Sequence, residues 1–128
     1  MPHITIEYSA NLEDRLDIAA LCAVALDAAG STGVLERAAT RVRAIRCDHV
    51  AIADGHADNS FVDASLRMGM GRTEAQKEAT GRAIYEAMRA FCDPLYATPF
   101  FALSLELREI DKALSWKENG IKRRFPEE

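Results

Sequence analysis

The second residue of the chain is a proline, Pro2, and it stands at the head of an alternating segment, residues 3–8. If Met1 is removed, as initiator methionines before small residues usually are, Pro2 becomes a free secondary amine at a fixed point on a sheet. Such an amine can act as a general base. Proline also occurs at the first residue of a strand for structural reasons, because proline has no backbone N–H to place in the ladder. The sequence therefore predicts a candidate base at Pro2, with a purely structural role as the alternative.

Three arginines could bind an anion near such a base. Arg41 and Arg43 are two residues apart in a predicted strand and would share one face of it, while Arg72 follows Gly71 just before a predicted helix. Arginine binds planar carboxylates with a fixed fork of donors and stays charged at any working pH. Gly71 permits a tight turn, and the helix start offers N–H groups that also favour an anion. We predict a carboxylate clamp; the alternative is a solvated strand edge and an ordinary loop cation.

Neither a metal site nor a disulfide framework is expected. The histidines do not have metal-ligand spacing, and the cysteines are odd in number, far apart and never in a C-x-x-C pair. These residues are His3, His49, His56, Cys22, Cys47 and Cys92. We therefore predict no metal and no other cofactor, and a reducing cytoplasmic location fits the dispersed cysteines best.

Composition limits the class of protein. The chain has 128 residues, of which 48% are hydrophobic and 28% charged, as is typical of one globular domain spanning residues 1–128. With 16 basic and 20 acidic side chains the formal net charge is -4, so there is no general attraction for nucleic acid or an anionic membrane. We expect neither as a partner. The start of the chain does not resemble a secretion signal, and its apolar runs are too short to span a bilayer.

The first half of the chain predicts a strand, a helix and a second strand. The strand covers residues 2–8, and the helix begins at an Asn11 cap and ends at Gly30. The second strand runs from Arg41 to about residue 53, with a bend near residues 46–49, and it closes at the hairpin dipeptide Asp54-Gly55.

The second half repeats that order. A strand over residues 62–70 precedes a helix that starts at the capping box of Thr73 and Gln76 and ends or bends at Pro94. A fourth strand covers residues 101–108. The tail after residue 111 contains Asn119-Gly120, a turn dipeptide, and predicts a small hairpin or a segment exchanged with another subunit.

This order predicts an α+β fold of two βαβ units. They would form a four-stranded mixed sheet with both helices on one face. The opposite face contains apolar as well as polar residues and needs a cover. Subunits that pack around a symmetry axis would supply it.

Several of these segments together resemble a known family. They are Met1-Pro2-His3-Ile4, Ala53-Asp54-Gly55, Phe61-Val62, Gly69-x-Gly71-Arg72-Thr73 and Ala102-Leu103-Ser104-x-Glu106. In order and spacing the chain, from Pro2 to about Gly120, resembles the 5-carboxymethyl-2-hydroxymuconate isomerases, a branch of the tautomerase superfamily. The joint presence of an amino-terminal proline and the Gly-x-Gly-Arg-Thr turn is the most specific part of the match.

The resemblance implies a tautomerase-like homotrimer without a cofactor, with each active site built around the terminal proline near a subunit boundary. It assigns Pro2 as the acid/base and Arg41 and Arg72 as the residues that bind a substrate carboxylate and stabilise charge; Arg43 is a further substrate-binding candidate. Nearby cations would keep the amine neutral by lowering its pKa. The family ketonises a dienol polycarboxylate in the bacterial breakdown of homoprotocatechuate.

Two alternatives stay open. The chain has Ile45 and Arg46 where family members carry an imidazole and an aromatic residue, and a change of one group in a pocket can alter substrate preference. A related tautomerase or hydratase that acts on another small unsaturated or keto acid is the first alternative. The second is a trimeric small-acid-binding protein that has no catalytic activity.

Overall fold

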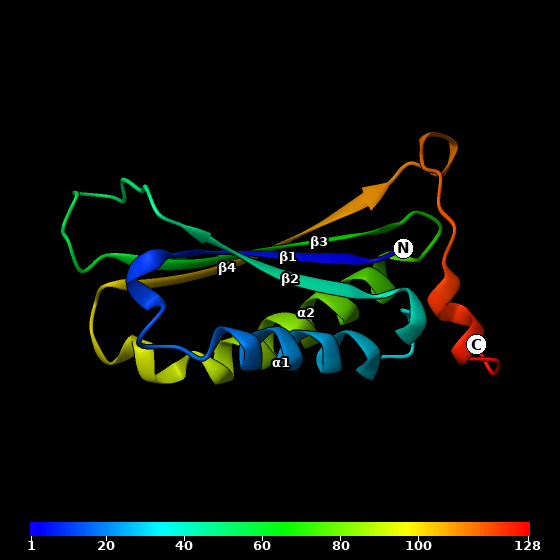
Figure 1. Cartoon of the computed structure of the whole chain (residues 1–128), viewed down its shortest axis with the longest axis horizontal. Helices are drawn as coiled ribbons and strands as arrows, with labels where there is room; N and C mark the ends of the chain where they lie inside the picture. The colour runs from blue at the N-terminus through cyan, green and yellow to red at the C-terminus, as the bar shows by residue number, and fades with distance from the viewer.

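A computed structural model describes residues 1–128, and it has two layers, a sheet and a pair of helices on one side of it (Figure 1). The strands are β1 His3–Ser9, β2 Arg41–Cys47, β3 Ser60–Gly69 and β4 Phe101–Ile110, and the helices are α1 Ile18–Ser31 and α2 Glu74–Phe91. The sheet order is β2-β1-β3-β4. β1 pairs with β2 and β3 with β4 in parallel, while β1 and β3 are antiparallel. The predicted mixed sheet of two βαβ units is confirmed.

The first helix begins later than predicted. Asp17 is its N-cap and accepts a hydrogen bond from the backbone N–H of Ala20 at 3.0 Å. Asn11 instead lies in a 3₁₀ turn, Ala10–Leu12, and donates from its amide to the carbonyl oxygen of Asn59 at 2.9 Å. The prediction that Asn11 caps this helix was therefore wrong, because the side chain of Asn11 hydrogen-bonds to Asn59, which is distant in sequence.

The second strand is shorter than predicted, and no hairpin follows it. β2 ends at Cys47, and β2 and β3 lie on opposite sides of β1. The connection over residues 48–59 must therefore pass the end of β1, which a two-residue hairpin cannot do. Asp54 and Gly55 form a turn inside this connection, with Gly55 at φ 81°.

The start of the second helix is confirmed. The hydroxyl of Thr73 accepts the N–H of Gln76 at 3.1 Å, and the side-chain oxygen of Gln76 accepts the N–H of Thr73 at 2.9 Å. α2 ends at Phe91, and Pro94 lies in the following 3₁₀ turn, Asp93–Ala97. None of the helices combines the length and the apolar character that crossing a bilayer requires.

The core lies between the helices and one face of the sheet. Ile4, Ile6 and Leu66 of the sheet are fully buried against Leu21 of α1 and Ile84 of α2. The opposite face carries the alternate residues of each strand and is not covered by any helix (Figure 1).

The residues after β4 form an arm, residues 111–128, that is not a hairpin. It contains two 3₁₀ turns, Lys112–Leu114 and Gly120–Arg124, and packs on a third turn, Arg37–Ala39. The amide of Asn119 donates to the carbonyl oxygen of Ala38 at 2.9 Å, and the carboxylate of Glu128 accepts the backbone N–H of Arg37 at 2.9 Å and that of Ala38 at 3.1 Å. The prediction of a hairpin was wrong, because the arm hydrogen-bonds to residues distant in sequence and not to itself as a pair of strands.

Candidate active site

A cavity of about 430 Å³ lies at the end of the sheet where β1 begins and β3 and β4 end. This volume is in the range of small-molecule sites. Its walls include Pro2, Arg72, Glu36 and two lysines of the arm, Lys112 and Lys117. The site therefore joins the start of the chain, the turn after β3 and the arm.

Pro2 is buried and held by the neighbouring strand. Its carbonyl oxygen accepts a hydrogen bond from the backbone N–H of Arg41 at 3.1 Å. The ladder of β1 and β2 begins one residue later, where His3 pairs with Arg41. Because proline has no backbone N–H, its place just outside the ladder leaves no donor unpaired. The start of β1 thus fixes the Pro2 ring at the cavity wall.

Arg72 reaches the cavity from the turn after β3. Gly71 has φ 109°, a conformation that favours glycine. Nη1 of Arg72 donates to the carbonyl oxygen of Gly69 at 3.1 Å, and Nη2 donates to that of Val34 at 3.5 Å. A Cβ at Gly69 would lie 3.2 Å from Nη1, so glycine allows this close approach. Arg72 has no carboxylate partner, and its positive charge stays available to a ligand.

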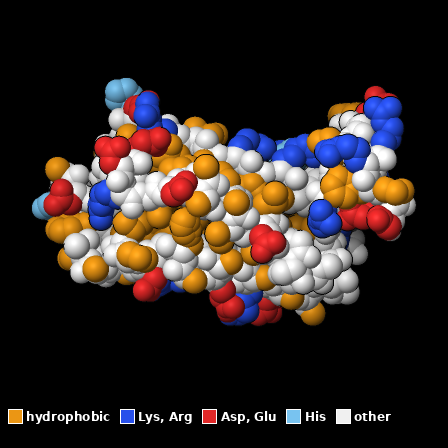
Figure 2. Space-filling model, turned by 60° about the horizontal axis from the view of Figure 1, so that its bottom comes forward, with side chains coloured by type: hydrophobic (Ala, Val, Ile, Leu, Met, Phe, Trp, Pro, Cys, Tyr) orange, Lys and Arg blue, Asp and Glu red, His pale blue; other side chains and the backbone are white.

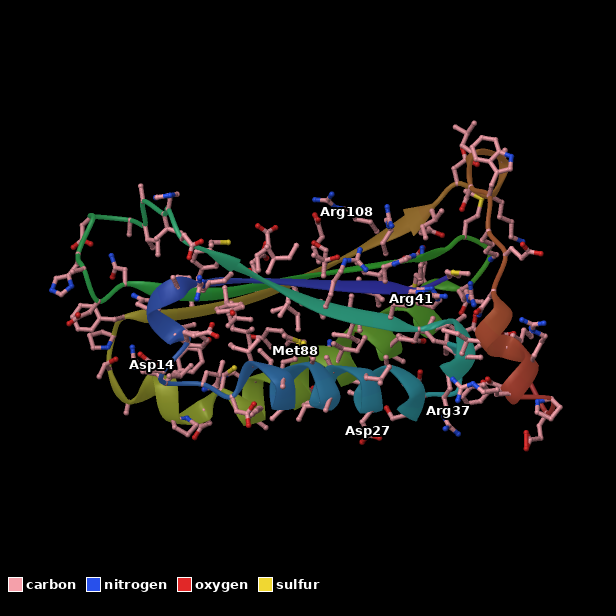
Figure 3. The ribbon with its side chains drawn as sticks, viewed as in Figure 1. Asp14, Asp27, Arg37, Arg41, Met88 and Arg108 are labelled. Carbon is pink, nitrogen blue, oxygen red and sulfur yellow. The ribbon has the colours of Figure 1, made fainter.

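Arg41 and Arg43 differ in position although they share a strand face. Nη1 of Arg41 donates to the carbonyl oxygen of Ala39 at 2.8 Å, beside the start of the chain (Figure 3). Arg43 lies farther along β2, where Nη1 is 3.2 Å from Nδ1 of His3. Burial lowers the pKa of His3, and neighbouring guanidinium groups, Arg67 first, lower it further. Pro2 and Arg72 thus line the cavity, Arg41 lies beside it, and Arg43 lies on the open sheet face.

The lysines of the arm were missed from the sequence. Lys112 and Lys117 line the cavity together with Ser115, and Glu36 of the opposite wall pairs with Lys122 at 3.3 Å. Basic side chains gather at the end of the molecule that the arm forms (Figure 2). The resemblance extended to about Gly120, but nothing in the local pattern of the tail predicts which of its charges face inward.

The electrostatics of the cavity favour a neutral amine. Burial lowers the pKa of the Met1 amine from its ordinary 8.0 to about 6, and Lys117, Arg72 and Arg41 add to the effect. Desolvation and positive neighbours both disfavour an ammonium group. Pro2, the next residue, is buried and lines the same cavity as Met1, together with Arg72 and Lys117. An amine at this position is therefore suited to accept a proton near neutral pH.

A larger hollow of about 560 Å³ lies between α2 and β4. Its charges compensate one another: Lys77 pairs with Glu74 at 2.6 Å and with Glu109 at 3.1 Å. Arg82 of this hollow also pairs with a carboxylate, Glu78, at 3.0 Å. The hollow therefore has no unpaired cation for an anionic ligand, whereas the cavity at Pro2 has Arg72. No group of three or more His, Cys, Asp or Glu side chains is placed to hold a metal ion. The cavity at Pro2 is therefore the candidate active site.

A four-stranded mixed sheet with two helices on one face is the fold of the tautomerases. The sequence model of one family, 5-carboxymethyl-2-hydroxymuconate isomerase, matches residues 2–125. The chain belongs to this family.

Individual relatives agree with this assignment. The chain is 29% identical to the 5-carboxymethyl-2-hydroxymuconate Delta-isomerase of Escherichia coli over 94% of this chain and 96% of that one. A crystal structure of a 5-carboxymethyl-2-hydroxymuconate delta-isomerase has a TM-score of 0.88 at 33% identity, over 98% of this chain and 93% of the other. A 5-carboxymethyl-2-hydroxymuconate isomerase from Deinococcus radiodurans R1 has a TM-score of 0.90 at 30% identity, over 97% and 93%. The match to this family thus covers nearly the whole chain.

Proposed function

We propose that this chain, after removal of Met1, is a cofactor-independent tautomerase that ketonises a dienol polycarboxylate. Its substrate would be 5-carboxymethyl-2-hydroxymuconate or a close analogue, and its place would be the breakdown of homoprotocatechuate. One observation carries the proposal: at the head of β1, burial first and then the cations Lys117, Arg72 and Arg41 lower the pKa of the Met1 amine to about 6. We expect the same surroundings to lower the pKa of the Pro2 nitrogen once Met1 is removed, so that it is ready to accept a proton from the substrate.

The reaction is a proton transfer along a conjugated chain. The neutral nitrogen of Pro2 removes the proton of the enol hydroxyl, a carbonyl forms, and the double bonds shift by one position. The protonated nitrogen then returns the proton to a carbon farther along the chain, so that one O–H bond is exchanged for one C–H bond. No electron acceptor is needed.

Arg72 and Arg41 stabilise the negative charge that develops on the dienolate. A guanidinium group in a partly closed cavity interacts more strongly with such a charge than it would in water. Main-chain carbonyls at 3.1 Å and 2.8 Å hold these two side chains, which keeps them oriented before substrate arrives. Arg43 contributes to substrate binding from the open face, where its charge attracts an anion over a longer distance.

The proposed assembly is a homotrimer with each cavity near a subunit boundary. β2 and β4 are unpaired sheet edges, and one sheet face has no cover. On the arm, beside the cavity, the side chains of Leu114 and Trp116 are 71% and 85% exposed. Apolar groups this exposed favour contact with another protein surface.

The test is conversion of purified dienol acids by the native protein. A tricarboxylate dienol should be ketonised rapidly, and phenylenolpyruvate, a monocarboxylate enol, should be a poor substrate. Preference for the monocarboxylate would favour a different tautomerase. Tight binding of the tricarboxylate without conversion would identify a small-acid-binding protein and exclude the proposed catalysis.

A further inference from the structure

The arm carries two lysines to the wall of the candidate active site, and side-chain hydrogen bonds shape the segment that bears them. Asp111 caps the first turn of the arm by accepting the N–H of Ala113 at 2.9 Å. Asn119, beyond the lysines, donates to the carbonyl oxygen of Ala38 at 2.9 Å. Lys112 and Lys117 lie between Asp111 and Asn119 and line the cavity that contains Pro2.

These lysines have no ion-pair partner, unlike Lys122 of the same arm, which pairs with Glu36. Together with Arg72 they give the cavity three uncompensated cations. Lys117 also lies within hydrogen-bonding reach of the chain's amino terminus, and its charge lowers the pKa of that amine. Like charges on the wall of one cavity repel each other, and a bound anion relieves this repulsion. The arrangement therefore favours a ligand with several negative charges.

The proposed substrate has more carboxylates than the two arginines nearest the cavity, Arg72 and Arg41, can pair with while they also stabilise the dienolate. A muconate skeleton has one carboxylate at each end, and the carboxymethyl branch adds a third. A lysine is a compact charge on a flexible stem, which suits a branch that can rotate, whereas arginine suits a fixed planar group. The arginines therefore suit the reacting end of the substrate, and the lysines suit its carboxymethyl branch.

We infer that Lys112 and Lys117 bind the carboxylate of the carboxymethyl branch and thereby set a preference for tricarboxylate over dicarboxylate dienols. This inference rests on the proposed function, because it names the part of the substrate that the arm recognises. The arm is then a specificity element of the active site, and Pro2, Arg72 and Arg41 act on the conjugated chain that both kinds of substrate share.

The test compares two substrates in lysine variants. In Lys112→Ala/Lys117→Ala, KM for 5-carboxymethyl-2-hydroxymuconate should rise about tenfold or more, while KM for 2-hydroxymuconate changes less than about twofold. Lys112→Arg/Lys117→Arg should restore most of the preference. The matched control is Arg123→Ala, which removes one positive charge from the arm outside the cavity and should alter neither KM. Equal effects on both substrates, or no effect, would overturn the inference and leave the proposed function intact.

A binding measurement separates failure of the inference from failure of the proposed function. Trp116 is the single tryptophan of the chain and precedes Lys117, so its fluorescence should report binding at the arm. Propane-1,2,3-tricarboxylate should bind to the wild type more tightly than glutarate, and the double alanine variant should lose this difference. If the wild type converts neither dienol, the proposed function fails. Lysine-dependent binding would still support the tricarboxylate site, and lysine-independent binding would contradict it.

Discussion

The backbone N–H of Arg41 donates a hydrogen bond to the carbonyl oxygen of Pro2 at 3.1 Å. This bond joins the residue proposed as the base to a residue proposed to stabilise charge, and it does so through the main chain. The two side chains are consequently positioned by the start of the sheet and not by flexible loops. A substitution of either side chain should leave this bond, and hence the start of the sheet, in place.

Blocking the nitrogen of Pro2 should abolish most activity without unfolding the protein. A variant with extra residues before Pro2 keeps the ring but makes its nitrogen an amide, which cannot accept a proton. We expect kcat to fall by about 10²- to 10⁴-fold, the usual contribution of a positioned base. Pro2→Ala should also lose most turnover. Steady-state kinetics and circular dichroism measure both effects, and a blocked variant with normal turnover would exclude Pro2 as the base.

Arg72→Ala should impair both binding and chemistry. It removes an uncompensated charge from the cavity, so KM should rise and kcat should fall together. A hydrogen bond to a charged group is worth about 1.5–3 kcal/mol, which corresponds to roughly a 10- to 150-fold loss in kcat/KM. Arg72→Lys should recover only part of it, because lysine lacks the fork of donors. If only the melting temperature changed, Arg72 would be a structural residue.

Arg41 and Arg43 should differ in their kinetic effects. Arg41→Ala removes a charge beside the start of the chain and should lower kcat. Arg43→Ala removes a charge on the open sheet face, so it should mainly raise KM, by a factor that shrinks as salt is added. Kinetics at low and high ionic strength distinguish the two. A large loss of kcat in Arg43→Ala with little in Arg41→Ala would reverse the assignment.

The exposed apolar residues of the arm should stabilise the proposed trimer. Leu114→Ser/Trp116→Ser removes the large apolar side chains that are 71% and 85% exposed in the single chain. Burying a tryptophan is worth on the order of 3 kcal/mol, so the variant should dissociate at concentrations where the wild type is assembled. Sedimentation velocity measures this. Trp116→Phe is the conservative control, and a serine variant that assembles as well as the wild type would contradict the role.

Sequence patterns correctly predicted the strands and helix ends that depend on residues close together in the chain. The alternation of Ile4 and Ile6 marked β1, and the capping box of Thr73 and Gln76 marked the start of α2. The cap of α1 was misplaced because Asn11 and Asp17 are both good caps, and only the contact of Asn11 with Asn59 distinguishes them. The end of β2 could not be predicted either, because it depends on how the chain passes β1.

The same distinction holds for the candidate site. Pro2 and Arg72 could be chosen from the sequence because one heads a strand and the other lies in a glycine turn before a helix cap. Lys117 could not, because its place depends on Asn119 and Glu128 contacting residues far earlier in the chain. A charged tail without periodicity contains no signal for such contacts.

The most direct test is a ¹⁵N NMR titration of the Pro2 nitrogen in the native protein. Burial and neighbouring cations favour the neutral form, so the nitrogen should titrate as a secondary amine with a pKa well below that of free proline. Below this pKa the amine is protonated and inactive, so kcat/KM should fall as pH decreases through the same value. A nitrogen that behaves as an amide, or an amine with the ordinary pKa of proline, would contradict the central claim.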